Sequence, residues 1–242
     1  MHLPALQTGR PDLDAAFRIA LGDIAGNIRP HRGELDAEAR PCLLAGLDYD
    51  KPWTRDAAFN TWYAGAALAP EVARNTLLAV LTRDEHGLRV GGEYWDAVVW
   101  IIGAWNLYLQ TGDRPFLARA SETSRNTLRY FEGTEQDPRE GLFRGGACFQ
   151  DGVAGYPDRF AESTTSGIAD YVRRHPEARA RPGYGLPMKA LSTNVLYAEA
   201  YRLAGKMADA LGEPDPSWSR RAEQLRAAIR AHFWNDATGT FR

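Results

Sequence analysis

The chain has 242 residues, 44% of them apolar, which is enough to bury a sizeable core as one large domain or two small ones. Its 29 basic and 31 acidic side chains leave a net charge of -2, and the basic residues are scattered, so no nucleic-acid partner is expected. The longest apolar run, Ala97 to Trp105, is too short for a bilayer, which needs roughly 20 apolar residues, so no membrane partner is expected.

Helical periodicity dominates the first half of the chain, and the alternation typical of strands is scarce. A first helix is expected over residues 13–28, with Asp12 as its cap. Thr54 can cap a second helix with its hydroxyl, and this helix would extend to Leu68. Pro70 suits the first position of a third helix, which would end near Thr82.

Four more helices are expected after a polar loop. Their ranges are 94–111, ended by Gly112, then 113–131, 188–211 and 218–233. Residues 133–187 between them are rich in glycine and aromatic residues and have almost no periodicity. Loops of that length in compact domains are usually functional or disordered, so this segment is expected to be a long active-site loop.

The polarity of these helices predicts an architecture. The helices beginning at 54 and 94 are small or apolar nearly all round, which indicates burial on every side, whereas 114–131 and 218–233 each show one apolar stripe. Inner and outer helices therefore alternate. This pattern predicts an all-α fold of stacked helical hairpins that close into a toroid, as a single domain over residues 1–242.

Chemically active residues gather at the starts of the inner helices or just before them. If the inner helices run parallel, their starts share one rim and these groups converge on one pocket. Carboxylate, amide and guanidinium groups suit the hydroxyls of a sugar, and aromatic rings suit its apolar C–H faces. The residues in question are Trp53, Arg55, Asp56, Glu93, Tyr94, Trp95, Asp96, Ser192 and Asn194.

Four stretches resemble the six-hairpin, (α/α)6-barrel glycoside hydrolases, with the α-glucosidase and trehalase-like group, including family 63, as the nearest. They are "YDKPWTRDAAF", "YWDAVVWIIGAWNLYLQTGD", "LSTNVLYAEAYRLAGKMADALG" and "RRAEQLRAAIRAHFWNDATGTF". The resemblance covers the chain from about residue 45 onward. Seven expected helices are fewer than the twelve of a closed toroid, so the resemblance implies a fragment truncated at its C-terminus or a shortened relative.

The resemblance also implies a mechanism. Such enzymes mostly invert configuration with two carboxyl groups about 6.5–9.5 Å apart, one protonating the leaving oxygen and the other activating water. Similar enzymes place the acid in the loop after the second hairpin, where this chain has "GGACFQDGVAGYPDRF". Asp151 is the expected acid, with Asp158 as the alternative. The base has no assured candidate, although Glu93 and Glu199 lie on suitable elements.

The resemblance further implies sugar contacts, and each has a structural alternative. Trp53, Arg55 and Asp56 would hold the sugar that is cleaved, Trp95 and Asp96 would form another wall of the pocket, and Glu93, Tyr94, Ser192 and Asn194 would add contacts. Alternatively, Arg55 and Asp56 form a charge pair at a helix start. Trp95, Trp100 and Trp105 can be plain core, and Asp151 can be a turn residue in an Asp-Gly pair.

Other chemistries find little support. The five histidines show no ligand spacing and no nucleotide-binding motif occurs, so neither metal nor cofactor is expected. Cys42 and Cys148 suit a reducing compartment, and no secretory signal is visible, so a cytoplasmic protein is expected. The rival functions are a sugar epimerase or isomerase and a non-catalytic carbohydrate-binding or scaffold protein. An incomplete toroid would expose apolar flanks, which favours a homo-oligomer.

Overall fold

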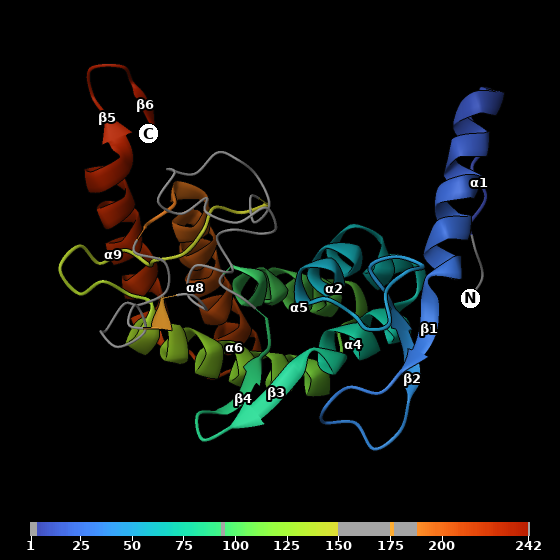
Figure 1. The fold of residues 1–242 in the computed structure, drawn as a ribbon, viewed down its shortest axis with the longest axis horizontal. Coiled ribbons are helices and arrows are strands. Elements are labelled where there is room, and N and C mark those ends of the chain that lie inside the picture. The colour runs from blue at the N-terminus through green and yellow to red at the C-terminus, as the bar shows by residue number, and fades with distance from the viewer. Residues whose placement is uncertain (1–3, 93–94, 150–174, 177–187, 242) are drawn as a thin grey trace. The chain divides into compact units, whose positions relative to one another are not determined.

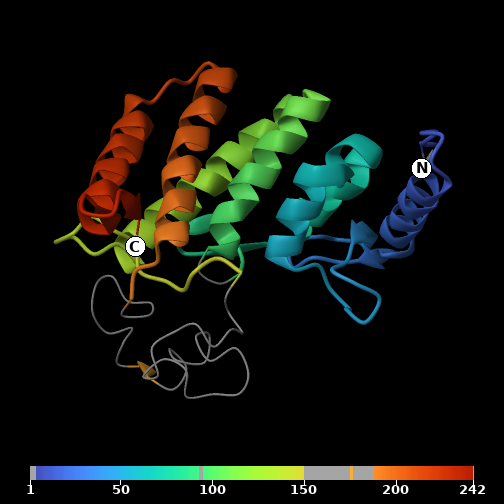
Figure 2. The same ribbon diagram turned by 90° about the horizontal axis from the view of Figure 1, so that it is seen from above.

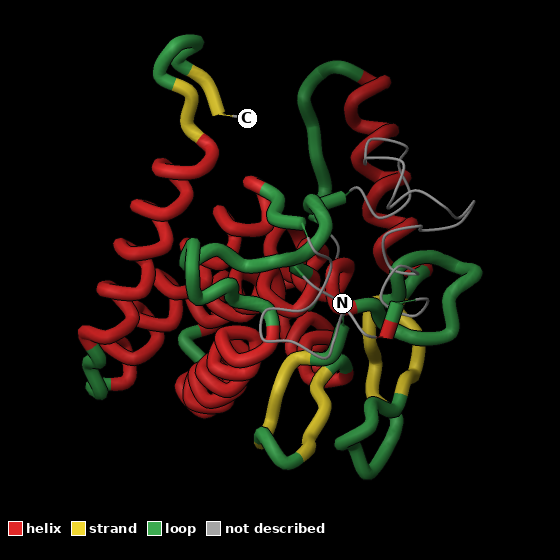
Figure 3. The backbone as a smooth tube through the Cα atoms, turned by 60° about the vertical axis from the view of Figure 1, so that its left-hand side comes forward, coloured by secondary structure: helices red, strands yellow, loops and turns green. Residues whose placement is uncertain are grey.

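The computed structural model describes residues 4–92, 95–149, 175–176 and 188–241. Helices make up most of this structure, and its strands are short antiparallel pairs, so the predicted all-α class is confirmed (Figures 1 and 3). The chain divides into two compact units. Met1–Gly92 and Trp100–Ala120 form the first unit, and Glu93–Val99 and Ser121–Arg242 form the second.

The first unit contains short helices and two strand pairs. Its elements are α1 (Pro11–Gly26), β1 (Ile28–His31), β2 (Arg40–Leu43), α2 (Thr54–Asn60), the π-helical turn η1 (Thr61–Gly65), α3 (Ala66–Leu68), α4 (Pro70–Ala79), β3 (Leu81–Asp84) and β4 (Gly87–Val90). Strands β1 and β2 pair with each other, as do β3 and β4. Helices α2, η1 and α3 follow one another directly and are called helix 54–68 below.

Long helices dominate the rest of the structure. They are α5 (Asp96–Thr111), α6 (Arg114–Thr134), α8 (Leu191–Leu211) and α9 (Pro216–Phe233), followed by the strand pair β5 (Trp234–Asn235) and β6 (Thr240–Phe241). Helices α5 and α6 each contribute residues to both units. Helices α8 and α9 lie side by side as an antiparallel hairpin in the second unit (Figure 2).

Local residue preferences explain most helix boundaries. Proline occupies the first turn of α1, α4 and α9, where its missing N–H costs no helical hydrogen bond. Gly112 and Gly212 end α5 and α8 with φ of 66° and 83°, which glycine adopts without strain. All seven predicted helix ranges match to within about three residues at each end. The predicted helix 70–82 ends at Ala79 because the chain then turns into the β3–β4 pair.

Two expectations for helix 54–68 were wrong. The Thr54 hydroxyl does not cap the helix but donates a hydrogen bond of 2.8 Å to the carbonyl of Gly91. The helix is also not buried on every side, since 39% of Trp62 and 72% of Tyr63 are exposed. Its small residues face inward and its aromatic residues face outward, a division that an all-apolar pattern conceals.

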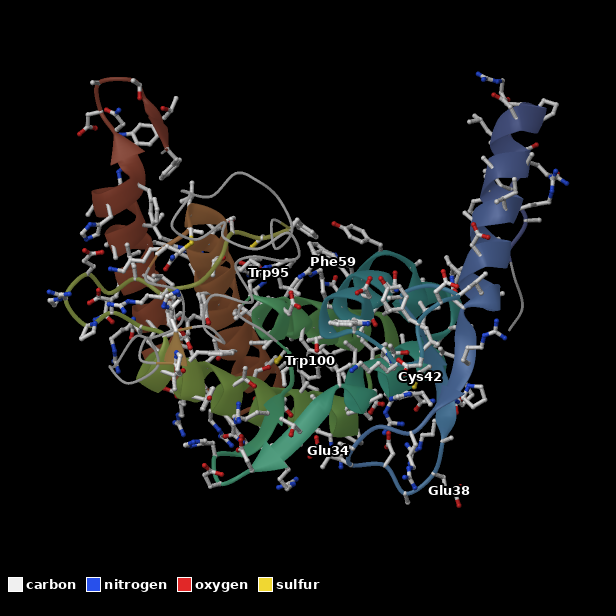
Figure 4. The ribbon with its side chains drawn as sticks, in the orientation of Figure 1. Glu34, Glu38, Cys42, Phe59, Trp95 and Trp100 are labelled. Carbon is white, nitrogen blue, oxygen red and sulfur yellow. The ribbon has the colours of Figure 1, made fainter. Side chains whose placement is uncertain are left out.

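The core of the first unit forms where α4 and helix 54–68 meet the second half of α5. Trp100 is fully buried, and its indole N–H donates to the carbonyl of Leu77 at 2.9 Å (Figure 4). This bond satisfies a carbonyl near the end of α4. Gly103 lies so close to Ala58 that a Cβ on Gly103 would be 2.8 Å from the Cα of Ala58. Trp100 is therefore core, as predicted, whereas Trp105 is half-buried.

Aromatic stacking organises the second unit. The rings of Phe143 and Tyr197 stack with centroids 3.7 Å apart and planes 4° from parallel. The Tyr201 hydroxyl donates to Glu132 at 2.7 Å, and Arg221 on α9 donates to the same carboxylate at 2.8 Å. These bonds join α6, α8 and α9 around one core. Among the helices that the structure describes, none has both the length and the apolar character needed to cross a membrane.

Candidate functional site

Trp53 lies directly before helix 54–68 with an extended backbone, φ -102° and ψ 143°, and 48% of it is exposed. The ring of Tyr49 meets it edge-on at 6.3 Å, and the Lys51 ammonium lies 5.5 Å from the centre of the indole ring. The Thr54 bond to Gly91 anchors this helix start to the segment that follows β4. The indole ring of Trp53 is therefore exposed, and the Thr54–Gly91 hydrogen bond holds the adjacent backbone in place.

Asp56 lies in the first turn of the same helix and is half-buried. Burial raises its pKa above the usual aspartate value, although its own backbone N–H and the neighbouring Arg55 act in the opposite direction. Burial is the largest influence, so Asp56 is not simply half of a solvent-exposed charge pair. A partly desolvated carboxyl group of this kind forms stronger hydrogen bonds with a ligand hydroxyl than one in open water.

Three aromatic residues follow Asp56 along the helix, and we call Phe59, Trp62 and Tyr63 the aromatic strip. The rings of Trp62 and Tyr63 lie 4.9 Å apart with planes 11° from parallel. The Phe59 ring, labelled in Figure 4, lies 6.2 Å from Trp62 and 5.9 Å from Tyr63, again nearly parallel. The strip is thus a set of near-parallel rings on the outer side of the helix.

A second group of predicted residues lies in the second unit. Only 3% of Trp95 is exposed, and its ring packs against Phe149 with centroids 4.8 Å apart. Asp96 is buried in the first turn of α5, close enough to Cys148 for its charge to help raise the pKa of that thiol. Phe149 is largely exposed and has a positive φ of 61°, which is uncommon for a bulky residue.

Asn194 has no exposed surface, and its hydrogen bonds go to backbone groups. Its carbonyl accepts from the Phe143 N–H at 2.7 Å, and its amide donates to the carbonyls of Phe143 and Ala190, both at 2.9 Å. The neighbouring Ser192 hydroxyl accepts from the Cys148 N–H at 3.1 Å. These bonds hold residues 143–148 against the start of α8, and the sugar contact of Asn194 stays a prediction.

A buried ionic cluster reinforces the same junction. Asp137, only 3% exposed, accepts a hydrogen bond from the Lys189 ammonium at 2.8 Å, and Arg144 lies 3.4 Å away. Lys189 also contacts Glu140. The hydrogen bond from Lys189 holds the pKa of Asp137 well below its usual range. The described part of the predicted loop 133–187 is thus tied to the segment before α8.

Several predicted residues have no structural description. Glu93, Tyr94, Asp151 and Asp158 lie outside the residues that the structure describes. Glu199, one candidate base, pairs with Arg202 on the same helix. The convergence of the helix starts on one rim stays a prediction, because Asp56 belongs to the first unit and Asp96 to the second.

Metal binding and thiol chemistry have no visible site in this part of the chain. Within residues 4–92, 95–149, 175–176 and 188–241, no group of three or more His, Cys, Asp or Glu side chains could hold a metal ion. Burial raises the pKa of Cys42 to about 11 and also raises the pKa of Cys148, so both thiols stay protonated at neutral pH.

The exposed indole of Trp53, the half-buried carboxyl group of Asp56 and the aromatic strip lie on helix 54–68 or directly before it. Such groups suit carbohydrate, and the fold that carries them contains helical hairpins. A sequence model of the "Mannosylglycerate hydrolase MGH1-like glycoside hydrolase domain" matches residues 49–242. The chain therefore belongs to this family of glycoside hydrolase domains. A comparison with curated protein sequences finds no match.

Sequence reasoning missed three features of these groups. The aromatic strip was hidden in "AAFNTWYAG", where two adjacent aromatic residues among small ones could have signalled an exposed pair. The Phe149 conformation leaves no mark in the sequence, because an aromatic residue normally avoids positive φ. The Asp137–Lys189 pair joins residues 52 positions apart, a distance at which spacing rules give no signal.

Proposed function

We propose that this chain hydrolyses a glycosidic bond and binds its sugar at the start of helix 54–68. The family match carries this proposal, since it begins at residue 49 and thus includes Trp53, Arg55 and Asp56. Trp53 would stack on an apolar sugar face, while Arg55 and Asp56 would hydrogen-bond to hydroxyls of the same sugar. The open Trp53 ring and the burial-raised pKa of Asp56 support these roles.

For the chemistry we propose inversion by two carboxyl groups, as in the family 63 and trehalase-like α-glucosidases that the sequence resembles. Asp151 would protonate the leaving oxygen, and a second carboxylate would deprotonate the attacking water on the opposite face of the sugar. Support for Asp151 comes from its motif and from the anchoring of the preceding residues 143–148 to α8. The base has no assignment, and Glu93 and Glu199 stay its candidates.

The first substrate to test is suggested by the family description. Mannosylglycerate joins a mannose to a small organic acid, and its hydrolysis needs no group beyond those proposed above. Cleavage of mannosylglycerate, trehalose and simple α-glucosides by the purified chain would separate the mannosyl from the glucosyl alternatives. Proton NMR of the freshly released sugar identifies its anomer and so tests inversion directly.

The Asp151→Asn variant tests the assignment of the acid. Loss of a general acid should lower turnover by roughly 100-fold to 10,000-fold while ligand affinity, measured by isothermal titration, stays close to wild type. The exposed Asp209→Asn variant on α8 is the matched control and should keep full activity. Unchanged turnover in Asp151→Asn would remove Asp151 from the mechanism and transfer the test to Asp158. Sugar binding without turnover by the wild type would identify a carbohydrate-binding protein instead.

A further inference from the structure

The aromatic strip has a geometry that an ordinary α-helix does not produce. Consecutive residues of an α-helix point about 100° apart, so adjacent side chains do not stack. Trp62 and Tyr63 nevertheless stack at 4.9 Å, and both lie in the π-helical turn Thr61–Gly65. Single π-helical turns inside α-helices are rare and frequently occur at functional sites.

Packing on the opposite side of the helix fixes the strip at the surface. Ala57, Ala58 and Gly65 are buried, and Ala58 is in close contact with Gly103 on α5. A Cβ on Gly65 would lie 3.3 Å from the Cβ of Ala73. Turning the helix would push large rings into these small spaces, so Trp62 and Tyr63 stay exposed.

The strip continues the proposed sugar contacts along one side of the helix. Asp56 and Phe59 are spaced at i and i+3, which places them on the same helical face, and Tyr63, seven residues after Asp56, has its ring nearly parallel to that of Phe59 at 5.9 Å. Seven residues correspond to roughly 10 Å along the axis, which is farther than one hexose ring can span while touching both ends. A sugar bound at Asp56 would therefore leave Trp62 and Tyr63 for the next unit.

We infer that the aromatic strip is a second sugar-binding subsite, which holds the unit adjacent to the one bound at Asp56. This inference rests on the proposed function. Trp62 and Tyr63 together expose no more than about 300 Å², judged from the size of aromatic side chains. A stable protein interface needs about 800 Å² on each partner, so a second copy of the chain does not fit this area, whereas one pyranose face does.

The test compares sugars of increasing length by isothermal titration. Mannose, mannobiose and mannotriose form one series, and glucose, maltose and maltotriose form the other. For the series that binds, wild type should bind the di- and trisaccharides more tightly than the monosaccharide. Trp62→Ala and Tyr63→Ala should each weaken di- and trisaccharide binding by about fivefold to tenfold and leave monosaccharide binding unchanged.

Two control variants separate stacking from general surface effects. Tyr63→Phe keeps the ring and should retain most of the trisaccharide affinity. Leu109→Ala removes an apolar side chain from α5 whose exposure, 60%, lies between those of Trp62 and Tyr63, and it should change nothing. Circular dichroism of each variant checks that the helices are intact.

Four outcomes would overturn the inference. Equal affinity of wild type for mono- and trisaccharide excludes the subsite and leaves the proposed function standing. Unchanged trisaccharide binding in both alanine variants has the same meaning. Binding of neither sugar series overturns the proposed function together with the subsite. Sedimentation that shows a wild-type dimer and a Trp62→Ala monomer would assign the strip to self-association.

Discussion

At the scale of single residues, the carboxyl group of Asp56 lowers the stability of the folded chain at neutral pH because it is partly buried. Burial raises its pKa, so the folded chain keeps this proton to a higher pH than the unfolded chain. The free energy of unfolding then falls as pH rises through the folded pKa of Asp56. Proteins often accept such costs where a group binds a ligand.

Replacing Asp56 by asparagine should therefore improve stability while weakening binding. We expect Asp56→Asn to unfold at a higher temperature than wild type at pH 7, with the difference shrinking as pH falls through the raised folded pKa toward the usual aspartate pKa of about 4. Sugar affinity should fall roughly tenfold, because a charged hydrogen-bond acceptor is lost. Thermal melts from pH 4 to pH 7 measure the first effect and titration measures the second. The exposed Asp23→Asn is the control, and a melt that is lower at pH 7 would contradict the argument.

Asp137 shows the opposite behaviour, because its ion pair lowers its pKa. Its contribution to stability is present above the usual aspartate pKa of about 4 and is lost as pH falls below that value toward the folded pKa. Asp137→Asn leaves Lys189 with a weaker partner and should lower the free energy of unfolding by roughly 3 kcal/mol at pH 7. Urea unfolding at pH 7 and pH 3 should show a smaller difference from wild type at the lower pH. An equal loss at both values would mean that packing, not charge, makes the contribution.

At the scale of elements, helix 54–68 and α5 depend on close contact between small residues. The approach of Gly103 to Ala58 leaves no room for a methyl group. Gly103→Ala should therefore destabilise the chain by about 1–3 kcal/mol and, by moving helix 54–68, weaken sugar binding as well.

The control for this variant is Gly133→Ala, at an open position in α6 with no heavy atom within 4 Å of the new Cβ. It should be neutral or stabilising by up to about 1 kcal/mol, since alanine is the better helix former. Thermal melts compare the two. A Gly103→Ala variant as stable as Gly133→Ala would mean that the helices separate without cost.

The length of each element explains which elements the sequence predicts poorly. Each helix was predictable from the 3.6-residue periodicity and from proline or glycine at its ends. The strands are two to four residues long, too short for alternation to stand out, and β1 and β2 each contain a proline. Strand pairing depends on contacts between segments and not on a repeating pattern within one strand.

At the scale of the whole molecule, membership of a glycoside hydrolase family and the all-α class agree with the sequence-based interpretation, while the assignment to the family 63 and trehalase-like group stays a prediction. The sugar contacts of Trp53, Arg55 and Asp56 stay predictions, made because an aromatic ring, a guanidinium and a carboxylate in four residues are a strong chemical signal. Asn194 was predicted from its place near the start of an inner helix and from the resemblance of its motif. Its type could not reveal that its amide is consumed by backbone hydrogen bonds.

Periodicity, helix-capping residues and a few chemical motifs in the sequence determined the class of fold, the helix ranges and the kind of ligand, because each of these depends on neighbours within a few positions. The tertiary structure alone decided which face of helix 54–68 meets solvent, the burial that raises the pKa of Asp56, and the pairing of Asp137 with Lys189. Exposure and electrostatic environment depend on residues that are distant in the chain and close in space, and no local pattern encodes them.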